Sequence, residues 1–147
     1  MNKVSVILPS LNVVGYIRKT MDGVVSQTLR DIEIICVDAG SDDGTWEILE
    51  EYAERDDRIK LISADKRSYG YQMNLAVHAA AGEYIGIVET DDYIEADMCE
   101  ILYETASSNN ADIVKSDFDM FTTDKHGTTV FLEYSLHRQN RVAYDRI

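Results

Sequence analysis

The sequence predicts an α/β protein with a mainly parallel β-sheet and helices on both faces. Apolar, β-branched runs that suit buried strands alternate four times with stretches of helical periodicity, which is typical of βαβ units. The chain has 147 residues, of which 45% are hydrophobic, and this is enough for one domain with a real core. We therefore expect residues 1–147 to form a single domain.

Five segments have the composition of strands: residues 4–8, 32–37, 59–62, 84–88 and 113–118. The run from Tyr84 to Val88 is almost uninterrupted and lies between Gly82 and an acidic cluster, so we expect it to be buried on both faces. Pro9 directly follows the first run and is expected to end it.

Four segments carry apolar residues at helical spacing: 17–29, 45–53, 69–81 and 98–105. Asn12 is placed to cap the first of these helices, and Asn109 and Asn110 are placed to close the last. Residues 121–132 are interpreted as a hairpin around Lys125–Gly127, and residues 135–147 show no clear period.

Groups suited to ligand contact follow three of the expected strands. They are Pro9, Ser10 and Asn12 after the first strand, Asp38, Ser41, Asp42 and Asp43 after the second, and Glu89, Asp91 and Asp92 after the fourth. Ligands of open α/β sheets bind outside the carboxyl ends of the strands. We therefore expect these three turns to form one ligand site at that edge of the sheet.

The acids Glu89, Asp91 and Asp92 stand so close in the sequence that they repel one another. This repulsion tends to raise their pKa values unless a cation joins them. Carboxylate oxygens are the hard ligands that suit Mg²⁺, Mn²⁺ or Ca²⁺. By position alone, the cluster fits a solvated acidic loop after a core strand equally well.

Charge and cysteine usage exclude several classes of protein. The net charge is −13 and no basic patch is visible, so we expect no nucleic-acid partner and no spontaneous docking to anionic lipid. Cys36 and Cys99 lie in apolar patterns and are expected to be buried thiols. The N-terminus has the pattern of a strand, and no apolar run is long enough to span a bilayer. We expect a cytoplasmic protein, peripheral to the membrane at most.

Two common phosphate-binding motifs are missing. The turn after the first strand is Pro9-Ser10-Leu11-Asn12, without the G-x-G-x-x-G of dinucleotide-binding proteins, and no P-loop motif occurs. A phospho-receiver domain would need an acid pair after the first strand, which the sequence lacks. The histidines His78, His126 and His137 have no partner at metal-binding spacing and are interpreted as surface or packing residues.

Taken in order, several segments resemble family 2 glycosyltransferases, which have the Rossmann-like GT-A fold. The segments are Val4–Pro9, Gln27–Thr28, Val37–Thr45, Gly82–Ile85 and Glu89–Asp92, and the resemblance runs from Val4 to about Phe118. It implies a nucleoside-diphosphate sugar as donor, most often a UDP-sugar, bound with Mg²⁺ or Mn²⁺. It also implies a sugar or lipid-linked acceptor and a place in cell-surface polysaccharide biosynthesis.

The resemblance assigns roles to individual residues. The family's D-x-D element falls on Glu89-Thr90-Asp91, which makes Asp91 the metal ligand and places Glu89 at the ribose or the metal shell. Asp92 would lie close to the donor sugar. The remaining expected contacts to the nucleotide sugar come from Pro9, Ser10, Asp38, Arg67 and Thr90, with Pro9 and Asp38 beside the base and Arg67 in the loop that flanks the phosphates.

The sequence departs from the family pattern at several positions: Glu89 replaces the first Asp of D-x-D, Ala39 an acid, Leu11 an aromatic residue and Met73 an arginine. The family's general base lies beyond the donor half, so the catalytic residue is unknown. Asp117 and Asp119 are interpreted as scaffold. We expect the chain to be a donor-binding half, truncated at its C-terminus.

Two alternatives stay open. The first is a non-catalytic nucleotide-binding or interaction module on the same fold, which the departures at Glu89, Ala39 and Met73 favour. The second is a nucleotidyltransferase, which uses the same metal chemistry. A sheet edge exposed near the C-terminal end would in addition allow a homo-oligomer to form.

Overall fold

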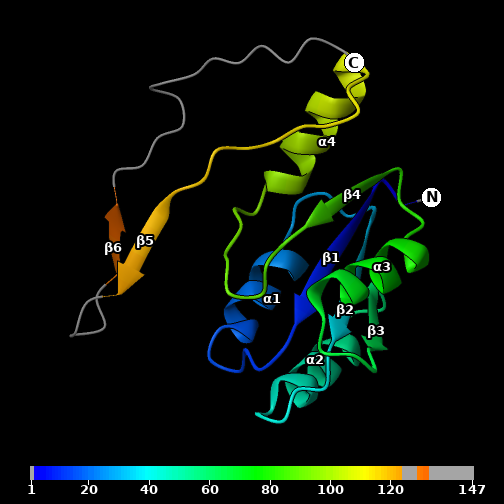
Figure 1. Ribbon diagram of the computed structural model, residues 1–147. Coiled ribbons are helices and arrows are strands. Elements are labelled where there is room, and N and C mark those ends of the chain that lie inside the picture. The colour runs from blue at the N-terminus through cyan, green and yellow to red at the C-terminus, as the bar shows by residue number, and fades with distance from the viewer. Residues whose placement is uncertain (1, 124–128, 133–147) are drawn as a thin grey trace. The chain divides into compact units, whose positions relative to one another are not determined.

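The computed structural model describes residues 2–123 and 129–132 of the chain (Figure 1). The expected hairpin turn around Lys125–Gly127 and the segment 135–147 lie outside the described residues. The chain divides into two compact units, Met1–Ala111 and Asp112–Ile147, which are described separately. The first unit contains the large sheet and all the residues expected at the ligand site.

The sheet of the first unit has four parallel strands in the order β3-β2-β1-β4. Their bounds are β1 Val4–Ser10, β2 Ile32–Asp38, β3 Ile59–Ser63 and β4 Tyr84–Ile87. In register, Val4 lies beside Ile32 of β2 and Tyr84 of β4, and Ser10 lies beside Asp38. The parallel α/β architecture expected from the sequence is confirmed.

Four helices cover the two faces of this sheet. They are α1 Ile17–Val25, α2 Thr45–Ala53, α3 Tyr69–Ala79 and α4 Met98–Asn109. On one face, Val6 and Leu8 of β1 pack in a cluster with residues of α1, α2 and α4. On the other face, Ile7, Ile35 and Val37 pack against Ala76 of α3. Side chains that alternate along β1 and β2 pack into the clusters on both faces, so both strands are buried throughout.

Strand β4 differs from the expectation that it is buried on both faces. Ile85 and Ile87 are 46% and 53% exposed, because β4 is the last strand of this sheet and, among the residues that the structure describes, pairs with β1 alone. They lie in register with Ser5 and Ile7. Helix α3 packs over Ile7 and the neighbouring β2 residues. An apolar run therefore did not distinguish an edge strand from a central one.

Two predictions about the first turn are wrong. Pro9 does not end β1, which continues through Ser10 beside Asp38. The β4 pairing stops at Ile7–Ile87, so the missing N–H of Pro9 costs no ladder hydrogen bond there. Asn12 does not cap α1, whose N-cap is Tyr16. Asn12 instead adopts a left-handed conformation with φ 55°. At the other end of the helical series, Asn110 closes α4 as expected, also in the left-handed region.

A buried polar network fixes the amino end of the sheet. The Glu33 carboxylate accepts hydrogen bonds from Ser5 Oγ at 2.6 Å and from the Ala81 N–H at 2.6 Å, and it pairs with Lys60. The Gly82 N–H donates to Ser5 Oγ at 2.8 Å. Burial opposes ionisation of Glu33, but the hydrogen bonds from Lys60, Ser5 and Ala81 outweigh it and lower its pKa to about 2. This network ties the loop before β4 to β1 and β2.

The second unit contains the expected hairpin. Strands β5 Met120–Thr123 and β6 Thr129–Leu132 pair antiparallel. The strand predicted over 113–118 is wrong, because these residues have no regular secondary structure. A strand needs a hydrogen-bonded neighbour, and within the described part of the chain these residues pair with none.

Candidate functional site

The turns after β1, β2 and β4 lie at one edge of the sheet, because these three strands are parallel neighbours. Direct contacts join them. Ser10 Oγ donates to Asp38 Oδ1 at 3.2 Å, and Thr90 Oγ1 donates to the Pro9 carbonyl oxygen at 2.9 Å. The structure thus brings together Pro9, Ser10, Asp38 and Thr90 from segments far apart in the sequence.

Asp38 is buried, and its carboxylate accepts hydrogen bonds from the turn that directly follows it. Its Oδ2 accepts hydrogen bonds from the N–H groups of Gly40 and Ser41 at 2.9 and 2.8 Å, and its Oδ1 accepts one from Ser41 Oγ at 2.5 Å. Such a carboxylate with several local donors shapes the backbone of a turn. Gly40 has φ 78°, a left-handed conformation that glycine adopts without strain.

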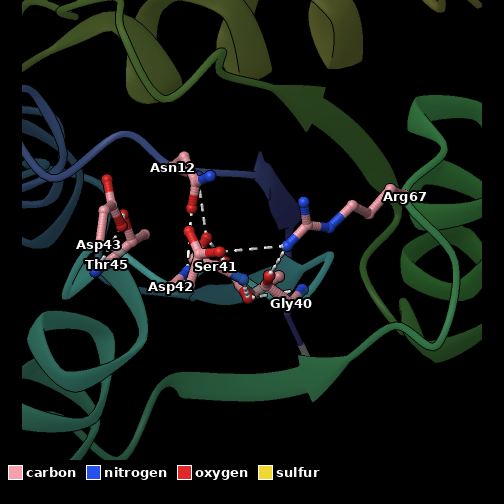
Figure 2. Close-up of polar contacts among 8 residues, drawn as sticks. Asn12, Gly40, Ser41, Asp42, Asp43, Thr45 and Arg67 are labelled. Carbon is pink, nitrogen blue, oxygen red and sulfur yellow. Dashed lines mark hydrogen bonds and ion pairs between the residues drawn. The ribbon is translucent and has the colours of Figure 1, made fainter.

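A reciprocal set of hydrogen bonds joins the β1–α1 loop to the β2–α2 loop (Figure 2). The Asn12 N–H donates to Ser41 Oγ at 2.9 Å, and the Asp42 N–H donates back to Asn12 Oδ1 at 3.0 Å. Asp43 accepts from the N–H groups of Val14 and Thr45, both at 3.0 Å. Asp43 therefore anchors both loops and the start of α2, and its hydrogen bonds to Thr45 and to backbone N–H groups lower its pKa.

Arg67 reaches across from the β3–α3 loop to the same turn, as Figure 2 shows. Its Nη2 donates to the Gly40 carbonyl oxygen at 2.9 Å and lies 3.6 Å from Asp42 Oδ2. Both charged side chains are largely exposed, at 58% and 74%. The ion pair is therefore weakly held, and the guanidinium is able to move to an anionic ligand at small cost.

The acidic turn after β4 is anchored at its first two residues. Tyr69 Oη donates to Glu89 Oε1 at 2.6 Å, and Thr90 is buried against Pro9. Asp91 and Asp92 are exposed. Desolvation and the neighbouring charges of Asp91 and Glu89 raise the pKa of Asp92. The turn thus combines a fixed backbone with carboxylates directed to solvent.

Side chains of helix α1 and of the loop after it hold the acidic turn and the residues that follow it. Thr20 Oγ1 lies 2.9 Å from the Thr90 carbonyl oxygen and 3.0 Å from that of Asp92. Gln27 is buried, and its Nε2 donates to the Glu95 carbonyl oxygen at 2.7 Å while its Oε1 accepts the Cys99 N–H at 2.9 Å. The loop between β4 and α4 is therefore fastened at both ends.

The carboxylates of the turn fit a cation that arrives with a phosphate ligand. Among residues 2–123 and 129–132, no three His, Cys, Asp or Glu side chains are grouped closely enough to hold a metal ion by themselves. Mg²⁺ usually keeps several waters and is held by one or two carboxylates together with substrate phosphates. Exposed Asp91, beside Asp92 on a fixed backbone, meets that requirement.

Sequence reasoning missed three residues that position the site. Thr20 and Gln27 hold the β4–α4 loop, and buried Gln72 of α3 donates to the carbonyl oxygens of Ser10 and Val37, both at 2.7 Å. The signal that could have found Thr20 and Gln72 is a polar residue among the apolar residues on the buried side of a helix. Gln27 is part of a segment that resembles the family, whereas nothing in the sequence pattern distinguishes Tyr69 from the other residues of its helix.

The parallel sheet, the helices on both faces and the acidic turn after β4 define a Rossmann-like domain of the GT-A type. The chain matches Glycosyl transferase family 2 over residues 5–145 and belongs to that family. It is 41% identical over 122 residues to the uncharacterized glycosyltransferase EpsJ of Bacillus subtilis. This alignment covers 83% of this chain and 36% of EpsJ. It is 38% identical over 119 residues to the cholesterol galactosyltransferase of Borreliella burgdorferi, covering 81% and 33% of the two proteins.

Solved structures give the same assignment. The S. aureus TarS 1–349 complex with UDP-GlcNAc has a TM-score of 0.69 and 28% identity, over 74% of this chain and 32% of that one. The mannosyltransferase PcManGT of Pyrobaculum calidifontis, with GDP-Man and Mn²⁺, has a TM-score of 0.58 and 27% identity, over 62% and 28% of the two chains. The chain thus spans about a third of the length of these relatives. No helix in the described part of the chain has the length and apolar character needed to cross a membrane.

Proposed function

We propose that this chain is the donor-binding part of a glycosyltransferase and binds a nucleoside-diphosphate sugar together with a divalent cation. The observation that carries the proposal is the acidic turn Glu89–Asp92, which is fixed to the end of β1 through Thr90 and Pro9 and held from α1 through Thr20. A rigid turn with exposed carboxylates at the carboxyl edge of a parallel sheet is suited to a metal–diphosphate ligand.

Each part of the edge has a role in this proposal. Asp91 holds the cation, and Asp92 lies toward the donor sugar. Pro9, Ser10 and Asp38 shape the floor beside the base, the last through its turn rather than by direct contact, because its carboxylate oxygens accept hydrogen bonds from Ser10, Gly40 and Ser41. When bound, Mg²⁺ or Mn²⁺ supplies neutralisation of the diphosphate charge that grows as the sugar leaves.

Arg67 supplies positive charge at the proposed position of the phosphates. With a net charge of −13, the chain repels an anionic ligand unless cations stand at the site. Release of the exposed Arg67 from Asp42 and its transfer to the diphosphate costs little, because an exposed ion pair contributes only about 0–1 kcal/mol. Nucleotide binding is thus expected to break the Arg67–Asp42 pair.

A UDP-sugar is the proposed donor, since the TarS relative was crystallised with UDP and with UDP-GlcNAc. A sugar or lipid-linked acceptor in polysaccharide assembly is the proposed second substrate, in keeping with relatives named chondroitin synthase and hyaluronan synthase. The acceptor hydroxyl would attack the anomeric carbon with inversion, and the general base for this step stays unassigned.

Calorimetric titration of the chain with UDP, with and without Mn²⁺, tests the proposal. We expect Mn²⁺-dependent binding that Asp91→Asn weakens by at least tenfold. Asp57→Asn is the matched control, because Asp57 is exposed in the turn between α2 and β3 and the substitution removes the same charge. Absence of metal-dependent heat with UDP, GDP and other nucleoside diphosphates would count against donor binding.

A non-catalytic nucleotide-binding module is the second candidate. The departures from the family pattern at Glu89, Ala39 and Met73 favour it. Release of free sugar from a bound UDP-sugar separates the two candidates. Binding of nucleotide without any hydrolysis or transfer would support the module.

A further inference from the structure

Tyr69 connects helix α3 to the acidic turn from a different direction than the residues already described. It is the first residue of α3, and the preceding Ser68 accepts the Tyr71 N–H at 3.4 Å as the helix N-cap. The Tyr69 side chain is 52% exposed, so apolar packing does not fix it. Its specific contact is the 2.6 Å hydrogen bond from its phenol to Glu89 Oε1.

This contact is made to a glutamate, whose side chain has one methylene more than the aspartate that the family pattern places there. The added torsion gives Glu89 more rotamers than an aspartate has, and binding to a ligand must freeze them. A donor from a separate helix removes that freedom before the ligand arrives. The same donor occupies one carboxylate oxygen, Oε1, and so determines which oxygen faces a ligand.

We propose that Tyr69 is a positioning residue that holds Glu89 in one rotamer, so that its Oε2 accepts a hydroxyl of the nucleotide sugar while Asp91 alone holds the cation. This inference rests on the proposed donor binding at the same edge. An acid already bonded to a phenol is a poorer metal ligand, whereas a hydroxyl donor needs just one free oxygen on it. The glutamate and the tyrosine thus form a functional pair.

The hydrogen bond to Glu89 also changes the pKa of the Tyr69 phenol. The Tyr69–Glu89 hydrogen bond raises the pKa of Tyr69, with a smaller contribution from desolvation of the phenol. The phenol therefore stays protonated and remains a donor at all physiological pH values. Tyr71, in the same helix, serves as a control tyrosine because its contacts are to other residues. It interacts with Asp65, and the Lys66 Nζ lies 4.7 Å from the centre of its ring.

The test compares Mn²⁺–UDP binding of the intact 147-residue chain by calorimetry for wild type, Tyr69→Phe and the control Tyr71→Phe. We expect Tyr69→Phe to weaken binding about three- to tenfold, as for loss of a partly exposed hydrogen bond to a charged group. The affinity of Mn²⁺ alone should not fall, and Tyr71→Phe should bind as the wild type does. Thermal unfolding of each variant checks that the fold is intact.

Glu89→Asp makes the test specific to the pair. The aspartate is too short to keep the hydrogen bond, so Tyr69→Phe should have no further effect in the Glu89→Asp background. In protein labelled with 3-fluorotyrosine, the ¹⁹F resonance that Tyr69→Phe removes should shift on addition of Mg²⁺–UDP. That shift should be lost in Glu89→Asp.

The outcomes separate the two levels of the proposal. Equal affinity of Tyr69→Phe and wild type would overturn the role of Tyr69 while donor binding stands. An equal loss from Tyr69→Phe in the wild-type and in the Glu89→Asp background would also overturn it, because the tyrosine would then act through the helix and not through the carboxylate. Absence of nucleotide binding by the wild-type chain would overturn donor binding itself, and the role of Tyr69 with it.

Discussion

The hydroxyl of Thr20 on α1 lies 2.9 Å from the carbonyl oxygen of Thr90, the middle residue of the Glu89-Thr90-Asp91 turn. The same hydroxyl lies 3.0 Å from the Asp92 carbonyl oxygen. One buried side chain therefore spans both ends of the segment that contains Asp91. The backbone of an acidic turn, which would otherwise spread under repulsion between its carboxylates, is held closed by a neutral donor from a helix.

We expect Thr20→Val to lower the free energy of unfolding by about 1–2 kcal/mol, because the buried Thr90 carbonyl oxygen and the partly buried Asp92 carbonyl oxygen lose the one hydroxyl proton that they share, while side-chain shape is kept. Binding of Mn²⁺–UDP should weaken several-fold beyond any loss of folded protein, since the turn loses its constraint. Urea denaturation and calorimetry measure the two effects. Thr105→Val is the control, because the Thr105 hydroxyl is exposed and bonds only within α4 to Ile101. Equal losses in both variants would show that Thr20 has no special relation to the turn.

Glu33 gives the fold a specific dependence on pH. Its pKa is lowered from 4.5 to about 2, so the folded state binds fewer protons than the unfolded chain between these values. The stabilisation is complete above the ordinary glutamate pKa and is lost as the pH falls toward 2. By linkage this amounts to about 3 kcal/mol.

The difference in unfolding free energy between wild type and Glu33→Gln, measured by urea titration, should therefore shrink as the pH falls from about 6 to about 2.5. Glu50→Gln, at an exposed position on α2, serves as the control for removal of a glutamate charge. A constant difference across that pH range would mean that the ionised form of Glu33 is not what stabilises the fold.

Gly82 is required where the α3–β4 loop passes β1. A Cβ atom at this position would lie 2.5 Å from the Ser5 backbone nitrogen and 2.7 Å from Ser5 Oγ. The Gly82 N–H donates to that same hydroxyl, so an added methyl group displaces the contact that holds the loop. We expect Gly82→Ala to destabilise the protein by about 2–4 kcal/mol.

The matched substitution is Gly70→Ala in α3, where no atom lies within 4 Å of the added Cβ. It should stabilise the protein by about 0.5–1 kcal/mol, because alanine is the better helix residue. Differential scanning calorimetry of both variants gives the comparison. A Gly82→Ala variant with the same melting temperature as the wild type would show that β1 shifts at Ser5 to accommodate the added methyl group.

The fold followed from the sequence where local pattern and tertiary environment agree. The central strands β1 and β2 are buried throughout, as their apolar runs predict. Strand β4 has a similar run but is an edge strand, because burial depends on a neighbour that the run itself does not specify. Residues 113–118 failed as a strand for the same reason.

The site was predictable in its location and less so in its internal contacts. Strand ends meet at one edge in any parallel sheet, so the placement of Pro9 and Asp38 at that edge followed from sequence position, whereas Thr90 was expected there from the family resemblance. The donors that hold them are not marked by any motif. Thr20 and Gln72 look like polar residues of ordinary helices, and their importance becomes evident only when the helices are placed against the sheet.

Asp92 should behave as a residue whose charge costs stability until a cation is bound. Desolvation and the charges of Asp91 and Glu89 raise its pKa, which means that its ionised form is disfavoured in the folded state. At neutral pH in EDTA, Asp92→Asn should therefore stabilise the chain slightly, by about 0.5 kcal/mol or less because the side chain is exposed. Asp57→Asn, exposed but outside the acidic turn, should not. With saturating Mn²⁺ and UDP the advantage of Asp92→Asn should disappear, since a bound cation offsets the repulsion that the substitution removes. Thermal unfolding in both conditions measures this, and a gain that persists with Mn²⁺ and UDP bound would show that the cation does not relieve the charge of the turn.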